Sequence, residues 1–170
     1  MHVDLLSLAR NLAMLDAKKP KQANLRRAVS SAYYGLFHCL VDECCRSLVG
    51  TQHAQSPYRH ILGRAFEHAT MKEACTSFAG SQLKAAVAKG LPASFAIPSE
   101  VKAVARAFAD AQEMRHLADY DRSERFVRSD VLALVEQIEA AIEDFADLSA
   151  SNEKKFFLIC LLTWKVLAKR

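Results

Sequence analysis

The feature that most constrains the fold is a run of apolar side chains between residues 21 and 49 that shows no strand-like alternation. These side chains recur at intervals of three and four residues and cover more than half of a helical circumference. They are Leu25, Ala28, Val29, Ala32, Tyr33, Leu36, Phe37, Leu40, Val41, Cys44 and Leu48. A helix that is apolar over so much of its surface must be surrounded by other helices. The run therefore predicts a long second helix at the centre of an all-α bundle.

The same three- and four-residue periodicity predicts the other helices. We expect them at about residues 3–17, 57–78, 99–120, from 129 onward and at 153–168, with a short amphipathic piece near 83–89. The prediction is thus a chain of about five to six helices, of which residues 1–150 form the main helical bundle. Residues 151–170 are expected to form an apolar C-terminal helix that packs on the bundle or on a partner.

Composition excludes several classes of protein. The 170 residues carry a net charge of +4, which permits an acidic partner such as RNA. There is no glycine-rich phosphate loop, and the histidines lack zinc-binding spacing, so neither a cofactor nor a metal is expected. The five cysteines show no C-x-x-C spacing and are expected to be reduced thiols. The apolar run FFLICLLTW is too short to cross a bilayer, so we expect no membrane partner and a cytoplasmic location.

A polar stripe interrupts the apolar surface of the long helix. Its members stand three or four residues apart and so share one helical face. They are Arg27, Ser31, Tyr34, His38 and Asp42. Such a line of hydrogen-bonding groups is able to hold a nucleotide. The alternative is an ordinary polar face in which His38 and Asp42 satisfy each other.

A second polar cluster ends the helix expected at residues 99–120. Arg115 and Asp119 stand four residues apart, as do His116 and Tyr120. If Arg115 faces a cleft, its guanidinium suits a phosphate, and His116 or Tyr120 would take part in proton transfer. The alternative is structural, because an Arg and an Asp at this spacing bond each other readily.

Together these two segments resemble bacterial members of the HEPN family, the higher eukaryotes and prokaryotes nucleotide-binding domains. The segment RRAVSSAYYGLFHCLVDECC at residues 26–45 is similar to the long second helix of that family, and RHLADYD at 115–121 looks like its later Arg-x-x-Ala-Asp-Tyr-Asp segment. The resemblance covers about residues 5–148. It implies a helical bundle that forms a homodimer and, in many members, a metal-independent ribonuclease whose cleft lies between two chains.

The catalytic pattern of the family departs at one position. Family ribonucleases carry an arginine, four to six residues and then a histidine, whereas Arg115 is followed at that spacing by Tyr120. Tyrosine, with an ordinary pKa of about 10, does not replace histidine as a base at neutral pH. His116 points about a hundred degrees away from Arg115 on a helix, and His38 would supply an imidazole only if the second helix faces the same cleft.

Three functional hypotheses follow. The first is an HEPN-like module that binds RNA or a nucleotide, as part of a toxin–antitoxin or defence system with a nucleotidyltransferase-type antitoxin as partner. Its ligand-binding residues would be Arg27, Tyr34, His38, Arg115, Asp119 and Tyr120. The second is a dimeric metal-independent endoribonuclease with Arg115, His38 and His116 as catalytic residues. The third is a structural or protein-interaction bundle without catalysis.

Overall fold

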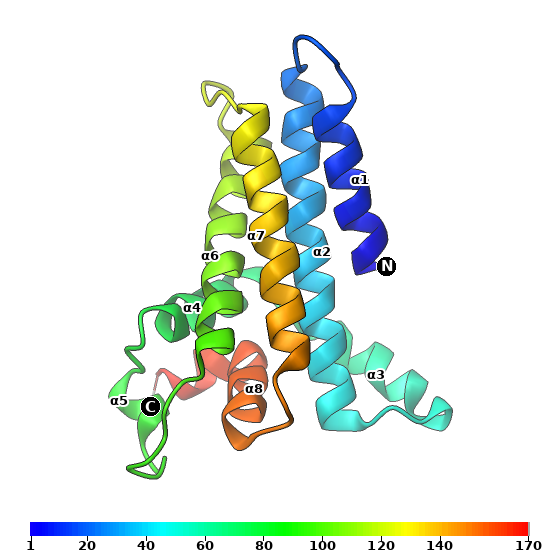
Figure 1. Ribbon diagram of the computed structural model, residues 1–170. Coiled ribbons are helices and arrows are strands. Elements are labelled where there is room, and N and C mark those ends of the chain that lie inside the picture. The colour runs from blue at the N-terminus through cyan, green and yellow to red at the C-terminus, as the bar shows by residue number, and fades with distance from the viewer. Residues whose placement is uncertain (170) are drawn as a thin grey trace. The chain divides into compact units, whose positions relative to one another are not determined.

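The computed structural model describes residues 1–169, which form helices and connections without a β-strand (Figure 1). The elements are α1 (His2–Met14), α2 (Gln22–Val49), the 3₁₀-helix η1 (His53–Gln55), α3 (Ser56–Gly63), α4 (His68–Ala79), α5 (Ala85–Ala88), α6 (Ser99–Tyr120), α7 (Arg128–Asp147) and α8 (Asn152–Leu167). The all-α prediction is therefore confirmed, and the long second helix begins and ends within one residue of its predicted bounds.

The number of helices differs from the predicted five to six, because the described residues form eight α-helices. The main cause is that the helix expected at 57–78 is two helices, α3 and α4. Glu67 has an extended backbone between them, with φ −114° and ψ 130°. This break allows Phe66 to be buried and the Glu67 carboxylate to reach Thr70 and Lys165. These tertiary contacts outweigh the helix propensity of the segment.

The chain divides into two compact units, and α2, α6 and α7 each contribute residues to both. The first unit consists of Met1–Cys39 and Ala107–Asp144. Within it α1, the first part of α2, the last part of α6 and most of α7 lie side by side (Figure 1). The α1–α2 and α6–α7 connections come together at one end of this four-helix arrangement, where α2 begins and α6 ends.

Small and aromatic side chains set the packing of the first unit. Gly35 of α2 faces α1, and a Cβ at this position would lie 3.1 Å from Cγ of Leu6. The absence of a side chain therefore lets the two helices approach closely. On the side of α2 that meets α6, the ring of Tyr33 packs against that of Phe108 with centroids 5.5 Å apart, and both are fully buried.

Hydrogen bonds tie the two connections of the first unit together. The Gln22 side chain donates to the carbonyl oxygen of Phe126 at 2.8 Å and accepts from the amide of the same residue at 3.0 Å. Arg128 donates to backbone carbonyl oxygens at the end of α1, those of Ala13, Asp16 and Ala17. Because these groups would otherwise lack partners at a helix end, the arginine stabilises both the helix and the connection.

The second unit consists of Leu40–Arg106 and the described residues from 145 onward. Its core is the contact of α4 with α8. The Phe78 ring of α4 lies against three rings of α8, at centroid distances of 5.0 Å from Phe157, 6.0 Å from Phe156 and 6.4 Å from Trp164. The apolar C-terminal segment therefore packs within the chain's own second unit. No helix of the described residues combines the length and apolarity that a membrane span requires.

A buried lysine stabilises the start of α8. The Lys154 side chain is 8% exposed, and its ammonium group lies 3.2 Å from the Glu43 carboxylate. It also donates to the carbonyl oxygens of Phe145 and Leu148, at 2.8 and 3.1 Å. Since an ammonium group has three N–H donors, all three find an acceptor. The lysine thereby joins α2, the end of α7 and α8.

Candidate functional site: an arginine among tyrosines in the first unit

The site in the first unit is centred on Arg115, in the last two turns of α6. The Arg115 Nε and the Asp119 carboxylate oxygen lie 2.7 Å apart, and their side chains are 19% and 25% exposed. The spacing of four residues places them on one helical face, as the sequence indicated. Asp119 also accepts a hydrogen bond of 2.7 Å from the Ser30 hydroxyl of α2. The pair is therefore part of an α2–α6 contact.

Three tyrosine rings surround the guanidinium group. Its Cζ lies 5.9, 5.8 and 5.7 Å from the ring centroids of Tyr33, Tyr34 and Tyr120. Its Nη2 also donates to the Tyr34 hydroxyl at 3.3 Å. Cation–π contacts at these distances favour the charged guanidinium. Burial opposes that charge, but the neighbouring Tyr34, Asp119 and Tyr120 outweigh burial and raise the pKa of Arg115 above its usual value.

The two imidazoles of the catalytic hypothesis lie beyond two of these tyrosines. The His38 ring stacks on that of Tyr34 with a centroid distance of 6.3 Å, and the His116 ring lies 5.1 Å from that of Tyr120. Among the described contacts, each imidazole is thus joined to Arg115 through one tyrosine. Burial, with a smaller contribution from the positive N-terminus, lowers the pKa of His38, which keeps this imidazole neutral at pH 7.

The basic residues at the start of α2 have different roles. Arg26 donates to four backbone carbonyl oxygens, those of Leu117 and Ala118 in the last turn of α6 and those of Asp121 and Glu124 just after it. Its guanidinium group is therefore a C-terminal cap of α6. Arg27, the next residue, is exposed and makes no hydrogen bond or ion pair with any residue that the structure describes.

The ends of the polar stripe on α2 do not behave as one surface. Asp42 lies in the second unit and pairs with Arg46, with 2.9 Å between carboxylate oxygen and Nε. The alternative in which Asp42 and His38 satisfy each other is therefore wrong for Asp42, because an arginine one turn further along the same helix face is a stronger partner for the carboxylate.

A hollow of about 340 Å³ lies at the end of the first unit, beside the network formed by Arg115, Asp119, Ser30 and Tyr34. We call these contacts the Arg115 network. Its lining residues come from the start of α2 and from the end of α6 with its following connection. They are Gln22, Arg26, Ala118, Asp119, Arg122 and Arg125. Asp119 belongs both to the hollow and to the Arg115 network. The hollow therefore brings the sequence-predicted residue Asp119 next to two arginines that the sequence prediction did not include.

Arg122 and Arg125 are exposed, and neither forms an ion pair with any described residue. The sequence carried a signal for them, since both lie in the basic run that follows the helix. Their spacing, however, did not show that the connection folds back over the start of α2. The Arg26 and Gln22 hydrogen bonds create that arrangement, and no periodicity reveals them.

The described residues contain no cluster of side chains that would bind a metal ion. Among residues 1–169 there is no group of three or more His, Cys, Asp or Glu side chains placed to hold a metal ion. None of the five cysteines forms a disulfide bond within the described residues. Burial raises the pKa of Cys44 and of Cys160 to about 12, so these two thiols stay protonated.

Comparison of the chain with protein-family models, with curated proteins and with solved structures gave no match.

Proposed function

We propose that the first unit is an HEPN-like module that binds a phosphate of RNA or of a nucleotide at the hollow beside Asp119. The observation that carries this proposal is the pair of exposed, unpaired guanidinium groups of Arg122 and Arg125 at the rim of that hollow. Guanidinium groups bind phosphate oxygens in a bidentate manner. Two of them on one connection form a phosphate-binding surface.

Charge neutralisation inside the site supports this proposal. Asp119 is the one carboxylate that lines the hollow, and it is already bound to Arg115 and to the Ser30 hydroxyl. The ion pair with Arg115 thus neutralises the Asp119 carboxylate, whose negative charge would otherwise repel a phosphate. In this view Arg115 is a positioning residue, and Arg122 and Arg125 are the groups that contact the ligand.

Basic residues extend the positive surface from the hollow. Exposed cations lie on the α1–α2 connection and at the start of α2, in the same unit. They are Lys18, Lys19, Lys21 and Arg27. Because single phosphates bind weakly, a nucleic acid that reaches several of these charges would bind more tightly and with a strong dependence on salt.

An exposed aromatic ring gives the surface a preference for bases. Tyr120, at the end of α6, is 66% exposed while its ring also lies over the Arg115 guanidinium. Stacking of a base on an exposed aromatic side chain contributes about 1–3 kcal/mol and tolerates any base. A single-stranded RNA or a nucleotide therefore suits the site better than a bare phosphate. The homodimer, the antitoxin partner and the defence role belong to this proposal through the family resemblance.

The experiment compares charge-matched variants. Binding of a short single-stranded RNA is measured by fluorescence anisotropy at several salt concentrations, for the wild type, for Arg122→Gln/Arg125→Gln and for Lys84→Gln/Lys89→Gln. The control removes two exposed lysines of the second unit. The arginine variant should lose at least tenfold in affinity and about two units of the salt slope, while the control changes little. Equal behaviour of the two variants contradicts the proposal.

Arg115→Ala provides a second test of the same site. Without Arg115, the Asp119 carboxylate keeps the Ser30 hydroxyl but presents an unneutralised negative charge to the hollow, so affinity for RNA should fall. If affinity and salt slope both stay at wild-type values, Arg115 has no part in ligand binding, and the Arg115 network serves only to join α2 to α6. That outcome favours the structural hypothesis.

A metal-independent ribonuclease is a second candidate, favoured by the lowered pKa of His38 beside Tyr34. A neutral imidazole is the form that accepts the proton of a 2′-hydroxyl group. RNA is incubated with wild-type protein and with His38→Ala/His116→Ala in the presence of EDTA. Cleavage by the wild type alone supports this candidate, and equal cleavage or none contradicts it.

A further inference from the structure

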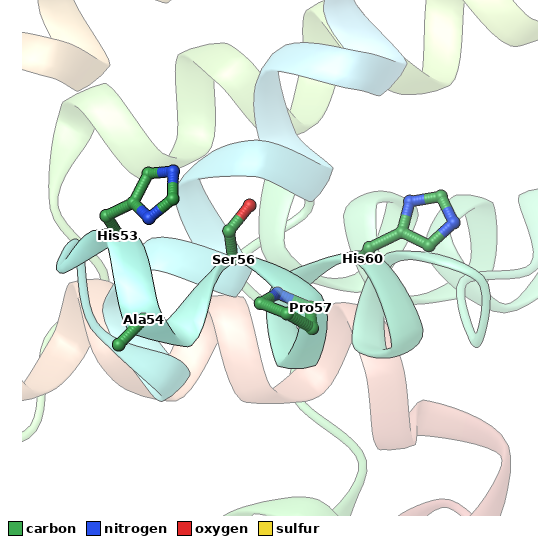
Figure 2. A pocket seen from close by; sticks show the side chains of 5 residues that line it. All are labelled: His53, Ala54, Ser56, Pro57 and His60. Atoms are coloured by element: carbon green, nitrogen blue, oxygen red, sulfur yellow. The ribbon is translucent and has the colours of Figure 1, made fainter.

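We propose that a separate hollow in the second unit, formed by η1 and the start of α3, is a binding site for a phosphate group. The hollow measures about 530 Å³ and is lined by His53, Ala54, Ser56, Pro57 and His60. Figure 2 shows the two imidazoles and the Ser56 hydroxyl on one side of the ribbon, with the serine between the rings. This inference goes beyond the function proposed for the first unit.

The spacing of the three polar side chains explains why they face one space. His53, Ser56 and His60 follow one another at three and four residues, and η1 continues directly into α3. Helical positions at these intervals lie on one face. The remaining lining residues, Ala54 and Pro57, have apolar side chains, so they form no side-chain hydrogen bonds with the two imidazoles or the serine hydroxyl.

These side chains have unused hydrogen-bonding capacity. All three are exposed, and within the described residues none of the three side chains forms a hydrogen bond or ion pair. Each imidazole carries at least one N–H donor in either protonation state, and the serine adds an O–H donor. Three donors around one space suit an oxyanion with several oxygens.

The charge of the surrounding segment selects an anion. No Asp or Glu occurs between Glu43 and Glu67. The same segment contains Arg59 and the exposed Arg64. Within this segment a ligand therefore meets basic side chains and no carboxylate, which favours an anion. A phosphate is preferred to a carboxylate because its tetrahedral oxygens are able to accept from three separated donors at once.

The hollow is held in shape by contacts outside its lining. Nη1 of Arg59 donates to the carbonyl oxygens of Gly50 and Gln52, at 2.8 and 3.0 Å. Gly50 has a φ of +102°, and a Cβ at this position would lie 2.3 Å from the Gln55 side-chain oxygen. The glycine therefore allows Gln55 to cover the turn. A turn fixed in this way spares the ligand part of the ordering cost.

The volume of the hollow indicates more than a free phosphate ion. Pockets for small molecules commonly measure about 300–1,000 Å³. The ligand class is therefore a phosphate attached to a larger group, which is either a phosphorylated small molecule or the backbone of an RNA. Both sources share the chemistry recognised by His53, Ser56 and His60, and the experiment separates them.

The test is a titration followed by NMR of the histidine ring protons and carbons. Inorganic phosphate, a nucleoside monophosphate and a short RNA are added in turn, with sodium chloride at matched ionic strength as the reference. Saturable shifts of the His53 and His60 signals are expected with phosphate. A tighter curve with the monophosphate identifies a small molecule, and a tighter curve with RNA identifies a backbone phosphate.

Variants decide whether these residues form the site. His53→Ala, followed through the His60 signals, and His60→Ala, followed through the His53 signals, should each weaken phosphate binding at least tenfold. Ser56→Ala, followed through both rings, should also weaken it, whereas His2→Ala in the first unit should leave it unchanged. Circular dichroism verifies that the variants are folded, as expected for exposed positions. Shifts that stay linear, or affinities that do not respond to the variants, overturn the proposal. Arg122→Gln/Arg125→Gln in the same titration separates this site from the first one, because it should not affect the His53 and His60 signals.

Discussion

Replacement of Arg26 by methionine tests whether one guanidinium group holds the end of the first unit together. Methionine keeps an unbranched apolar stem but removes the charge and all N–H donors. The four carbonyl oxygens that Arg26 binds then lose that partner, and the contact of the guanidinium with the Phe126 ring, at 5.5 Å, is lost as well.

The expected magnitude follows from the number and setting of these bonds. A hydrogen bond to a charged group contributes about 1.5–3 kcal/mol. The four bonds share two nitrogen atoms, and their acceptors lie partly at the surface, where water replaces the lost donors. We therefore expect a loss of about 2–4 kcal/mol in the free energy of unfolding. For a chain of this size that corresponds to a decrease in melting temperature of roughly 4–16 °C.

The assay is urea denaturation followed by far-ultraviolet circular dichroism, with Arg27→Met as the matched control. Arg27 is the next residue, loses the same charge and has no described partner, so its replacement should cost less than about 0.5 kcal/mol. The variants are compared by the urea concentration at the midpoint of unfolding, because the chain has two units and the slope of the curve can change with the variant. If the two variants unfold at the same urea concentration, the capping role of Arg26 is refuted.

Three further predictions concern other parts of the chain. Lys154→Met should lower the free energy of unfolding by about 3 kcal/mol, because it leaves the Glu43 carboxylate and two carbonyl oxygens without their donor. The control Lys155→Met, at an exposed position, should change the free energy of unfolding little. Equal effects of the two variants in thermal melts would contradict a stabilising role of the buried contacts. Since burial lowers the pKa of His38 below its usual 6.5, protonation favours the unfolded chain, and stability should fall as the pH decreases from about 6.5 toward the lower folded pKa. His38→Gln should flatten this part of a pH series of denaturation curves, and an unchanged slope would argue against the effect. The pKa of about 12 for Cys44 and Cys160 leaves a thiolate fraction of roughly 10⁻⁴ at pH 8, so iodoacetamide should label these two cysteines only in denaturant. Rapid labelling of the native protein, detected by mass spectrometry, would contradict this expectation.

Local interactions explain the parts of the structure that the sequence predicted well. The apolar periodicity placed α2 and α6 within about one residue of their observed ends, because that periodicity is the same chemistry that buries one face of each helix. The ion pair of Arg115 with Asp119 also followed from spacing alone, since both partners belong to one helix. The same reasoning placed His116 beside Tyr120.

Contacts between distant segments were beyond such reasoning. Spacing along one helix does not show that Arg26 caps the end of α6 or that Tyr34 accepts a hydrogen bond from Arg115. The break between α3 and α4 depends on burial of Phe66 and on the contact of Glu67 with Lys165, nearly a hundred residues away in the chain.

The sequence by itself therefore determined the helical class, the position of the long helices and the residue types available for binding. The tertiary structure alone decided which arginines are consumed as helix caps, Arg26 and Arg128, and which remain exposed at a hollow, Arg122 and Arg125. The physical reason is that helix periodicity is a property of neighbours in the chain, whereas the backbone carbonyl oxygens that occupy a guanidinium group belong to segments brought together only by folding.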